Sequence, residues 1–204
     1  MFLAKELKEN PQIAASRRDA FMQPNILKLI AVLIPDPVAA LVRAEQQYIA
    51  DHFGSKHALR TPPHITLIPP LEVNDEEIKK IVSIGKEIST QIQSFKLELN
   101  GFGTFKPRVV FIKIMENKLL NDLYRLWRSQ LEKHAPHLLA RYPDRPYHPH
   151  LTLAHRDVSP QQFDEIWKYY EEKSFESEIE ITGSWMLKHS SSGWEREMEF
   201  KFDT

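Results

Sequence analysis

The tetrapeptide His64-Ile65-Thr66-Leu67 returns almost unchanged later in the chain, as His150-Leu151-Thr152-Leu153. In each copy a histidine and a threonine lie two residues apart, with apolar residues between and after them. Successive side chains of a β-strand point to opposite faces, so the histidine and threonine of each copy share one face, and the apolar residues point into a core. Two such strands would direct two imidazoles and two hydroxyls into one cleft. We expect the rest of the chain to support that arrangement.

The sequence around the two copies alternates between strand and helix signals. Short apolar runs and alternating polar and apolar residues predict strands at 26–34, at 64–68 (ended by Pro69-Pro70), at 95–100, at 109–114, from 150 onward, and at 174–182, 184–189 and 194–202. Apolar residues at helical spacing predict helices over 38–53, 75–92, 117–134 and 161–170. Asn74 is the expected N-cap of the second, and Ser159 or its neighbour that of the fourth. Gly101 and Gly103 indicate a bulge or a close approach of the backbone.

Both motif strands follow a proline-rich loop and precede a helix, so the sequence has two halves with a similar order of elements. This order predicts an α+β fold with two lobes and a cleft between them. We expect a single domain over residues 25–204 and a peripheral extension over residues 1–24.

Composition narrows the function classes. The chain has 204 residues, of which 42% are hydrophobic, enough for a sizeable core. With 27 basic and 28 acidic residues it is nearly neutral, which does not fit a generic nucleic-acid binder. It has no cysteine, which excludes disulfides, thiolate nucleophiles and cysteine-built metal sites. No signal-peptide core opens the chain, and the apolar run at 26–35 is too short for a bilayer, so we expect a soluble, cytoplasmic protein.

Two histidines on one cleft face indicate acid–base chemistry. Imidazole changes charge near neutral pH, so one histidine can take a proton while the other gives one. Hydrolysis of a phosphodiester needs both, because an attacking oxygen loses a proton and a leaving oxygen gains one. The hydroxyls of Thr66 and Thr152 can donate hydrogen bonds to non-bridging phosphate oxygens. This chemistry needs no metal or other cofactor, and no metal-ligating carboxylates flank either copy.

The sequence resembles the two-histidine (2H) phosphoesterases, whose signature is two H-x-[ST]-x motifs roughly eighty residues apart. It looks most like the branch of RNA 2′,3′-cyclic phosphodiesterases and 2′-5′ RNA ligases. The supporting features are the strand ending at Pro35, Pro63 before the first motif, and Tyr147-His-Pro-His150 leading into the second. The likeness covers about residues 25–203.

The resemblance implies a bilobal α+β fold, in which two antiparallel sheets with outer helices surround a central cleft. It also implies that one motif histidine is the general base on water and the other the general acid toward the ribose oxygen. The usual family product, a 2′-phosphate, implies His150 as the base and His64 as the acid. The residues alone permit either assignment.

Other side chains would hold the rest of an RNA end. Phe102, Phe105 and Tyr147 lie in loops that the family places near the cleft, where an aromatic face can stack a base, with core packing as the competing role. The candidates for phosphate contacts are Arg108, Arg145 and Lys188. His155, just past the second motif, could rim the cleft.

The expected substrates are RNA ends or small cyclic nucleotides, with no membrane and no obligate protein partner. Ligation of 2′-5′ linked RNA is the reverse kind of reaction at the same site. Two alternatives stay open: an RNA-end binding module without turnover, and a 2H enzyme acting on a non-RNA phosphodiester, such as 2′-5′ oligoadenylate or another cyclic phosphate.

Overall fold

The computed structural model describes residues 26–203, and the extension expected over residues 1–24 lies outside that range. The chain order is β1 (Ile26–Leu33), α2 (Val38–Phe53), the 3₁₀ turn η1 (His57–Arg60), β2 (His64–Val73), α3 (Asp75–Ser89), β3 (Phe95–Phe105), β4 (Val109–Ile114), α4 (Lys118–His134), the 3₁₀ turn η2 (Pro136–Leu139), β5 (His150–Ala154), α5 (Pro160–Tyr170), β6 (Glu176–Ile181), β7 (Gly183–Ser190) and β8 (Gly193–Lys201). The predicted order of strands and helices is confirmed.

The strands form one curled sheet in the order β6-β3-β4-β5-β2-β1-β7-β8, with every neighbouring pair antiparallel. Between the central strands β2 and β5 the ladder holds a single residue pair, Ile65 with Leu151. The two four-stranded halves therefore correspond to the two expected sheets, and this one pair joins them into a continuous sheet. The predicted α+β class is confirmed.

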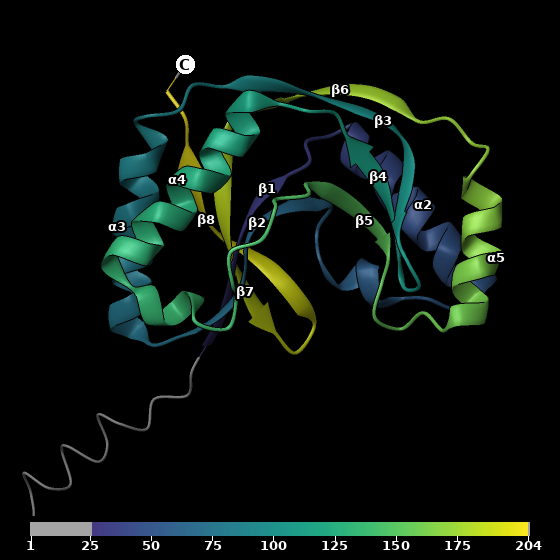
Figure 1. Ribbon diagram of the computed structural model, residues 1–204, viewed down its shortest axis with the longest axis horizontal. Helices are drawn as coiled ribbons and strands as arrows, with labels where there is room; N and C mark the ends of the chain where they lie inside the picture. The colour runs from purple at the N-terminus through teal and green to yellow at the C-terminus, as the bar shows by residue number, and fades with distance from the viewer. Residues whose placement is uncertain (1–25, 204) are drawn as a thin grey trace, which may run out of the picture.

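Each half of the sheet is covered by helices on one face. α3 and α4 pack on the half that holds β2, β7 and β8, whereas α2 and α5 pack on the half that holds β4 and β5 (Figure 1). α2 follows β1 in the chain but contacts β5, and α4 follows β4 but contacts β2. Each half of the sheet is thus covered in part by a helix that follows a strand of the other half, and these crossed helices connect the two lobes.

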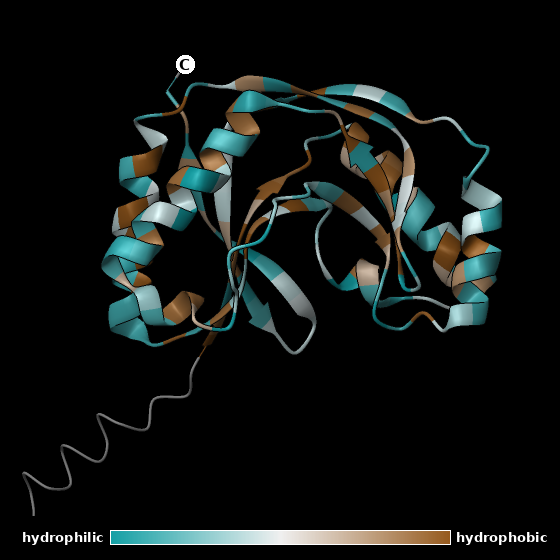
Figure 2. Cartoon of the chain, viewed as in Figure 1, coloured by the Kyte–Doolittle hydropathy of each residue, from teal (hydrophilic) through white to brown (hydrophobic). Residues whose placement is uncertain are grey.

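The helix starts agree with the sequence signals. The side chain of Asn74 accepts a hydrogen bond from the Glu77 N–H, and Glu77 accepts one in return from the Asn74 N–H, which forms a capping box. Ser159 and Gln162 form a second capping box at α5, with Pro160 in the first turn. Hydrophobic and hydrophilic bands alternate along the helices in Figure 2, as expected for helices with one face on a core.

The prediction that Pro69-Pro70 ends the first motif strand is wrong, because β2 continues to Val73. Its ladder with β1 pairs Ile68 with Ile30 and Leu71 with Lys28, and the register shifts between these pairs. The two prolines fall in this irregularity, where the missing N–H groups interrupt no regular pairing. The predicted bulge in β3 is confirmed by a register shift between Leu99 and Phe102, around Gly101 with φ 67°.

Candidate active site

The single pair between β2 and β5 fixes the geometry of the two motifs. Because Ile65 lies opposite Leu151 in an antiparallel ladder, the residues on either side pair crosswise. His64 therefore lies beside Thr152, and Thr66 beside His150, with all four side chains on one face of the sheet. Ile65 and Leu151 point to the other face and are fully buried in the core. The two motifs are thus related by an approximate twofold axis through the central pair.

Both catalytic candidates hold their imidazole in the same way. His64 Nδ1 lies 2.8 Å from the carbonyl oxygen of Pro62, and His150 Nδ1 lies 2.8 Å from that of His148. A carbonyl oxygen can only accept, so each Nδ1 carries the hydrogen and donates it. This leaves each Nε2 to accept a proton when the ring is neutral, and to donate one when the ring is charged.

Burial favours the neutral form of both imidazoles in the free protein. It lowers the pKa of His64 to about 4, where the charges of His150 and Arg43 add to the effect and outweigh the hydrogen bond to Pro62. Burial also lowers the pKa of His150, and the charge of His148 acts in the same direction. A bound anion between the rings would oppose these effects, because it favours the protonated form.

Each motif threonine has its main-chain carbonyl held by a side chain from another element. Gln46 Nε2 of the buried α2 side chain donates to the Thr152 oxygen at 2.8 Å. The Tyr147 hydroxyl donates to the Thr66 oxygen at 3.1 Å. Both strands are therefore fixed beside the point where β2 and β5 separate.

Two aromatic rings pack against His150. The ring centroid of Phe105 lies 4.9 Å from that of His150 in an edge-on arrangement, and that of Phe111 lies 5.2 Å away. Phe105 is 40% exposed. Both rings line a hollow of about 340 Å³ together with Lys113, Met115 and His148. The candidate Phe105 is thus brought next to the motif histidine.

Lys113 is a residue that the sequence argument missed. It pairs with His150 across the β4–β5 ladder, so its exposed side chain shares the face of the motif residues. The sequence predicted a strand over residues 109–114, but only the register of β4 on β5 places the lysine beside a histidine.

A second histidine pair borders the first motif. His57 and His155 meet edge to face with ring centroids 4.8 Å apart. Burial lowers the pKa of His155 to about 4, with the charges of His57, Arg156 and His64 acting in the same direction. The Asp157 carboxylate accepts hydrogen bonds from the Ser55 hydroxyl and from the N–H groups of Lys56 and His57, which holds η1 against the end of β5.

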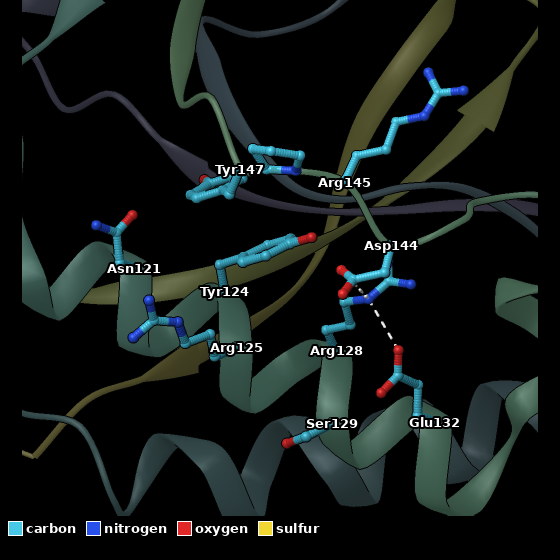
Figure 3. A pocket seen from close by; sticks show the side chains of 10 residues that line it. Asn121, Tyr124, Arg125, Arg128, Ser129, Glu132, Asp144, Arg145 and Tyr147 are labelled. Atoms are coloured by element: carbon cyan, nitrogen blue, oxygen red, sulfur yellow. Dashed lines mark ion pairs between the residues drawn. The ribbon is translucent and has the colours of Figure 1, made fainter.

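The remaining sequence candidates divide into those near the cleft and those away from it. Tyr147 and Arg145 line a hollow of about 710 Å³ beside α4 (Figure 3). Arg108 is exposed in the turn after Phe105, and its N–H donates to the Phe105 carbonyl. Lys188 pairs with Lys28 on β1. Trp185 pairs with Ala31, which in turn pairs with Thr66, so Trp185 and Thr66 share a face of the sheet. Lys188 lies three residues after Trp185, and strand alternation therefore puts it on the opposite face. Phe102 is buried against Tyr170.

Residues 26–203 contain neither a metal-binding cluster nor a membrane-spanning helix. No set of three His, Asp or Glu side chains there is arranged to hold a metal ion. None of the helices in this range has the length and apolar character needed to cross a bilayer.

Comparison with known proteins gives a consistent family. A family model described as the 2′-5′ RNA ligase superfamily matches residues 34–193. The RNA 2′,3′-cyclic phosphodiesterase of Bacillus subtilis (strain 168) is 32% identical over 97 residues, 46% of this chain and 51% of that protein. Relatives from Geobacillus and Oceanobacillus match over 58% to 62% of their own length, so the chain spans less than two thirds of these curated relatives.

Solved structures share the fold. TT0787 of Thermus thermophilus superposes with a TM-score of 0.65 at 22% identity, over 86% of this chain and 97% of that one. E. coli LigT complexed with 3′-AMP superposes with a TM-score of 0.61 at 20% identity, over 89% of this chain and 100% of that one.

Proposed function

Since the chain belongs to the 2′-5′ RNA ligase superfamily, we propose that it hydrolyses 2′,3′-cyclic phosphate ends of RNA or nucleotides to a 2′-phosphate, without a metal ion. The observation that carries the proposal is the crosswise pairing of the two motifs. It brings two Nδ1-anchored imidazoles and two hydroxyls to one face of the sheet. The name of the Bacillus subtilis relative supports this choice of substrate.

In the proposed complex the cyclic phosphate lies between the two Nε2 atoms. Thr66 and Thr152 donate hydrogen bonds to its non-bridging oxygens, and so stabilise the charge that grows there during attack. Phe105 is beside His150 and offers an exposed ring face on which the terminal base can stack. Lys113, on the same face, adds a positive charge.

The reaction exchanges one P–O bond for another. His150 takes a proton from water as the water oxygen bonds to phosphorus. The bond between phosphorus and O3′ breaks, and His64 gives a proton to O3′. The products are a 2′-phosphate and a free 3′-hydroxyl, and the two histidines have exchanged their protonation states. The family resemblance supplies this direction, and the approximate symmetry of the site permits the reverse, so both need testing.

His64 must be protonated to act as the acid. Its pKa of about 4 in the free protein means that the charged form is scarce at neutral pH. The negative charge of a bound cyclic phosphate raises that pKa, so substrate binding itself favours the protonated form of His64.

The test is hydrolysis of 2′,3′-cyclic AMP in the presence of a chelator. We expect one product, adenosine 2′-phosphate, identified by chromatography against both isomers. His64→Gln and His150→Gln should each lower kcat by about 10² to 10⁴-fold, the usual contribution of a positioned acid or base. Hydrolysis at the wild-type rate in either variant would contradict the two-histidine mechanism, and a 3′-phosphate product would contradict the stated direction of cleavage.

A further inference from the structure

Three hollows follow one another away from His150. The hollow at Phe105 and the next one, of about 290 Å³, share His148 in their walls. The latter shares Tyr124, Arg128, Arg145 and Tyr147 with the hollow of about 710 Å³ beside α4. A continuous surface therefore runs from Phe105, where the terminal nucleobase is proposed to stack, past His148, to the exposed side of α4.

This surface is rich in arginine, although the chain as a whole is nearly neutral. The walls of the two hollows nearest α4 contain Arg125, Arg128, Arg141 and Arg145, which we call the arginine track, against the carboxylates Glu132 and Asp144. Four arginines share these walls with two carboxylates, and Arg125 and Arg141 also pair with Asp122 and Glu72 beside the walls. The nearly neutral composition thus hides a local concentration of arginine side chains.

The arginines differ in how firmly they are held. Arg128 is 15% exposed and lies 2.9 Å from Glu132 and 3.5 Å from Asp144, so it is fixed within the protein. Arg125 is 74% exposed, and its one ion pair among residues 26–203 is with Asp122 at 3.5 Å. Arg145 is also exposed and borders both hollows. Arg125 and Arg145 are therefore the members that a ligand can reach.

A stacked tyrosine pair lies between these two arginines in Figure 3. The ring centroids of Tyr124 and Tyr147 are 4.0 Å apart and the ring planes differ by 2°. The hydroxyl of Tyr147 also reaches the carbonyl of Thr66 in the first motif. The same residue thus belongs to the wall of the arginine track and contacts the strand of the proposed catalytic site.

We infer that the arginine track binds backbone phosphates of a single-stranded RNA whose terminal cyclic phosphate lies between His64 and His150. Exposed guanidinium groups flanking an aromatic pair match a polyanion with stacking bases, since arginine pairs with phosphate oxygens and aromatic rings accept bases of any sequence. This inference rests on the proposed function and deepens it, because it assigns an oligonucleotide rather than a mononucleotide as the preferred substrate.

The test compares the double variant Arg125→Glu/Arg145→Glu with the double variant Lys80→Glu/Lys168→Glu. The control lysines are exposed on α3 and α5, and the change in charge is the same. Binding of a fluorescent RNA of about ten nucleotides with an ordinary 3′-hydroxyl end is measured by anisotropy at several salt concentrations. Hydrolysis is measured with 2′,3′-cyclic AMP and with the same RNA bearing a 2′,3′-cyclic phosphate.

We expect the track variant to bind RNA roughly tenfold or more weakly, with a salt dependence shallower by about 1.4, since each lost phosphate contact on a single strand contributes about 0.7. The ratio of kcat/KM for RNA over cyclic AMP should fall to a similar extent, and the control should match wild type.

Equal RNA binding by the wild type and the track variant would overturn the inference, whatever the hydrolysis shows. An equal loss of binding in the control would overturn it as well, because any loss of positive charge would then suffice. Absence of hydrolysis by the wild type would refute only the proposed function, since the binding measurement uses an RNA without the reactive end.

Discussion

Gln46 donates a hydrogen bond from its side-chain amide to the main-chain carbonyl of Thr152, 2.8 Å away. This contact ties α2, which follows β1 in the sequence, to the strand of the second motif in the other half of the sheet. Arg43 extends the connection, since it donates to the Gln46 side-chain oxygen and to the Leu59 carbonyl. The loop before the first motif and the strand of the second are therefore linked through one helix.

Replacing Gln46 by leucine should destabilise the protein by about 1 to 3 kcal/mol, because the carbonyl of the half-buried Thr152 loses this donor. Denaturant unfolding measures the change. Gln47→Leu is the matched control, since Gln47 lies one residue along α2, is exposed and bonds to Asp51. If both variants lost the same stability, the contact with Thr152 would not be the cause.

The division of labour between the histidines can be tested with a substrate whose leaving group needs no proton. A cyclic phosphate with sulfur in place of O3′ expels a thiolate, so loss of the general acid matters little. We expect this substrate to restore most of the rate in His64→Gln but not in His150→Gln. Rescue of His150→Gln alone would reverse the assignment.

The motif threonines should act mainly on kcat. Thr66→Val and Thr152→Val keep the side-chain shape but remove a hydroxyl donor, and loss of one such donor in other enzymes costs about 10² to 10³ in kcat. The measurement is steady-state kinetics with 2′,3′-cyclic AMP. An increase in KM with unchanged kcat would show that the hydroxyls bind the ground state and the transition state equally.

Acid should destabilise the fold through the half-buried imidazoles of His64 and His155. The pKa values of His64 and His155 are about 4 in the folded protein, against an ordinary value of 6.5. Between pH 6.5 and pH 4 the unfolded chain therefore binds more protons than the folded one, so stability falls as the pH falls through this range. We expect Tm to fall less between pH 7 and pH 4 in a His64→Gln/His155→Gln variant than in wild type. The exposed His134→Gln is the control, and an equally steep fall in all three proteins would contradict the prediction.

Lys113 should contribute to substrate binding through its charge. It faces His150 across the ladder, so Lys113→Met keeps a long side chain but removes the positive charge near the bound phosphate. We expect KM for cyclic AMP to rise several-fold, with the difference shrinking at high salt because screening weakens the lost attraction. Arg108→Met, in the turn beyond Phe105, serves as the comparison for a more distant charge. A larger effect from Arg108→Met would show that the turn, rather than the cleft face, contacts the phosphate.

The sequence by itself determined the element order, the helix caps at Asn74 and Ser159, and the four motif residues. These depend on local spacing: strand alternation sets which side chains share a face, and capping depends on residues three apart. It also led to the family, which the match over residues 34–193 confirms. The predicted end of the first motif strand was wrong because proline is tolerated where a ladder is irregular. That irregularity depends on the partner strand.

Only the tertiary structure decided which distant residues meet. The register of β4, β5 and β2 places Lys113 beside His150 and Thr152 beside His64, and the helix crossover brings Gln46 to Thr152. The arginine track forms because α4 and residues 144–147 pack together. Such contacts join residues far apart in the chain, and they depend on strand register and helix packing, to which a local pattern of residues is insensitive.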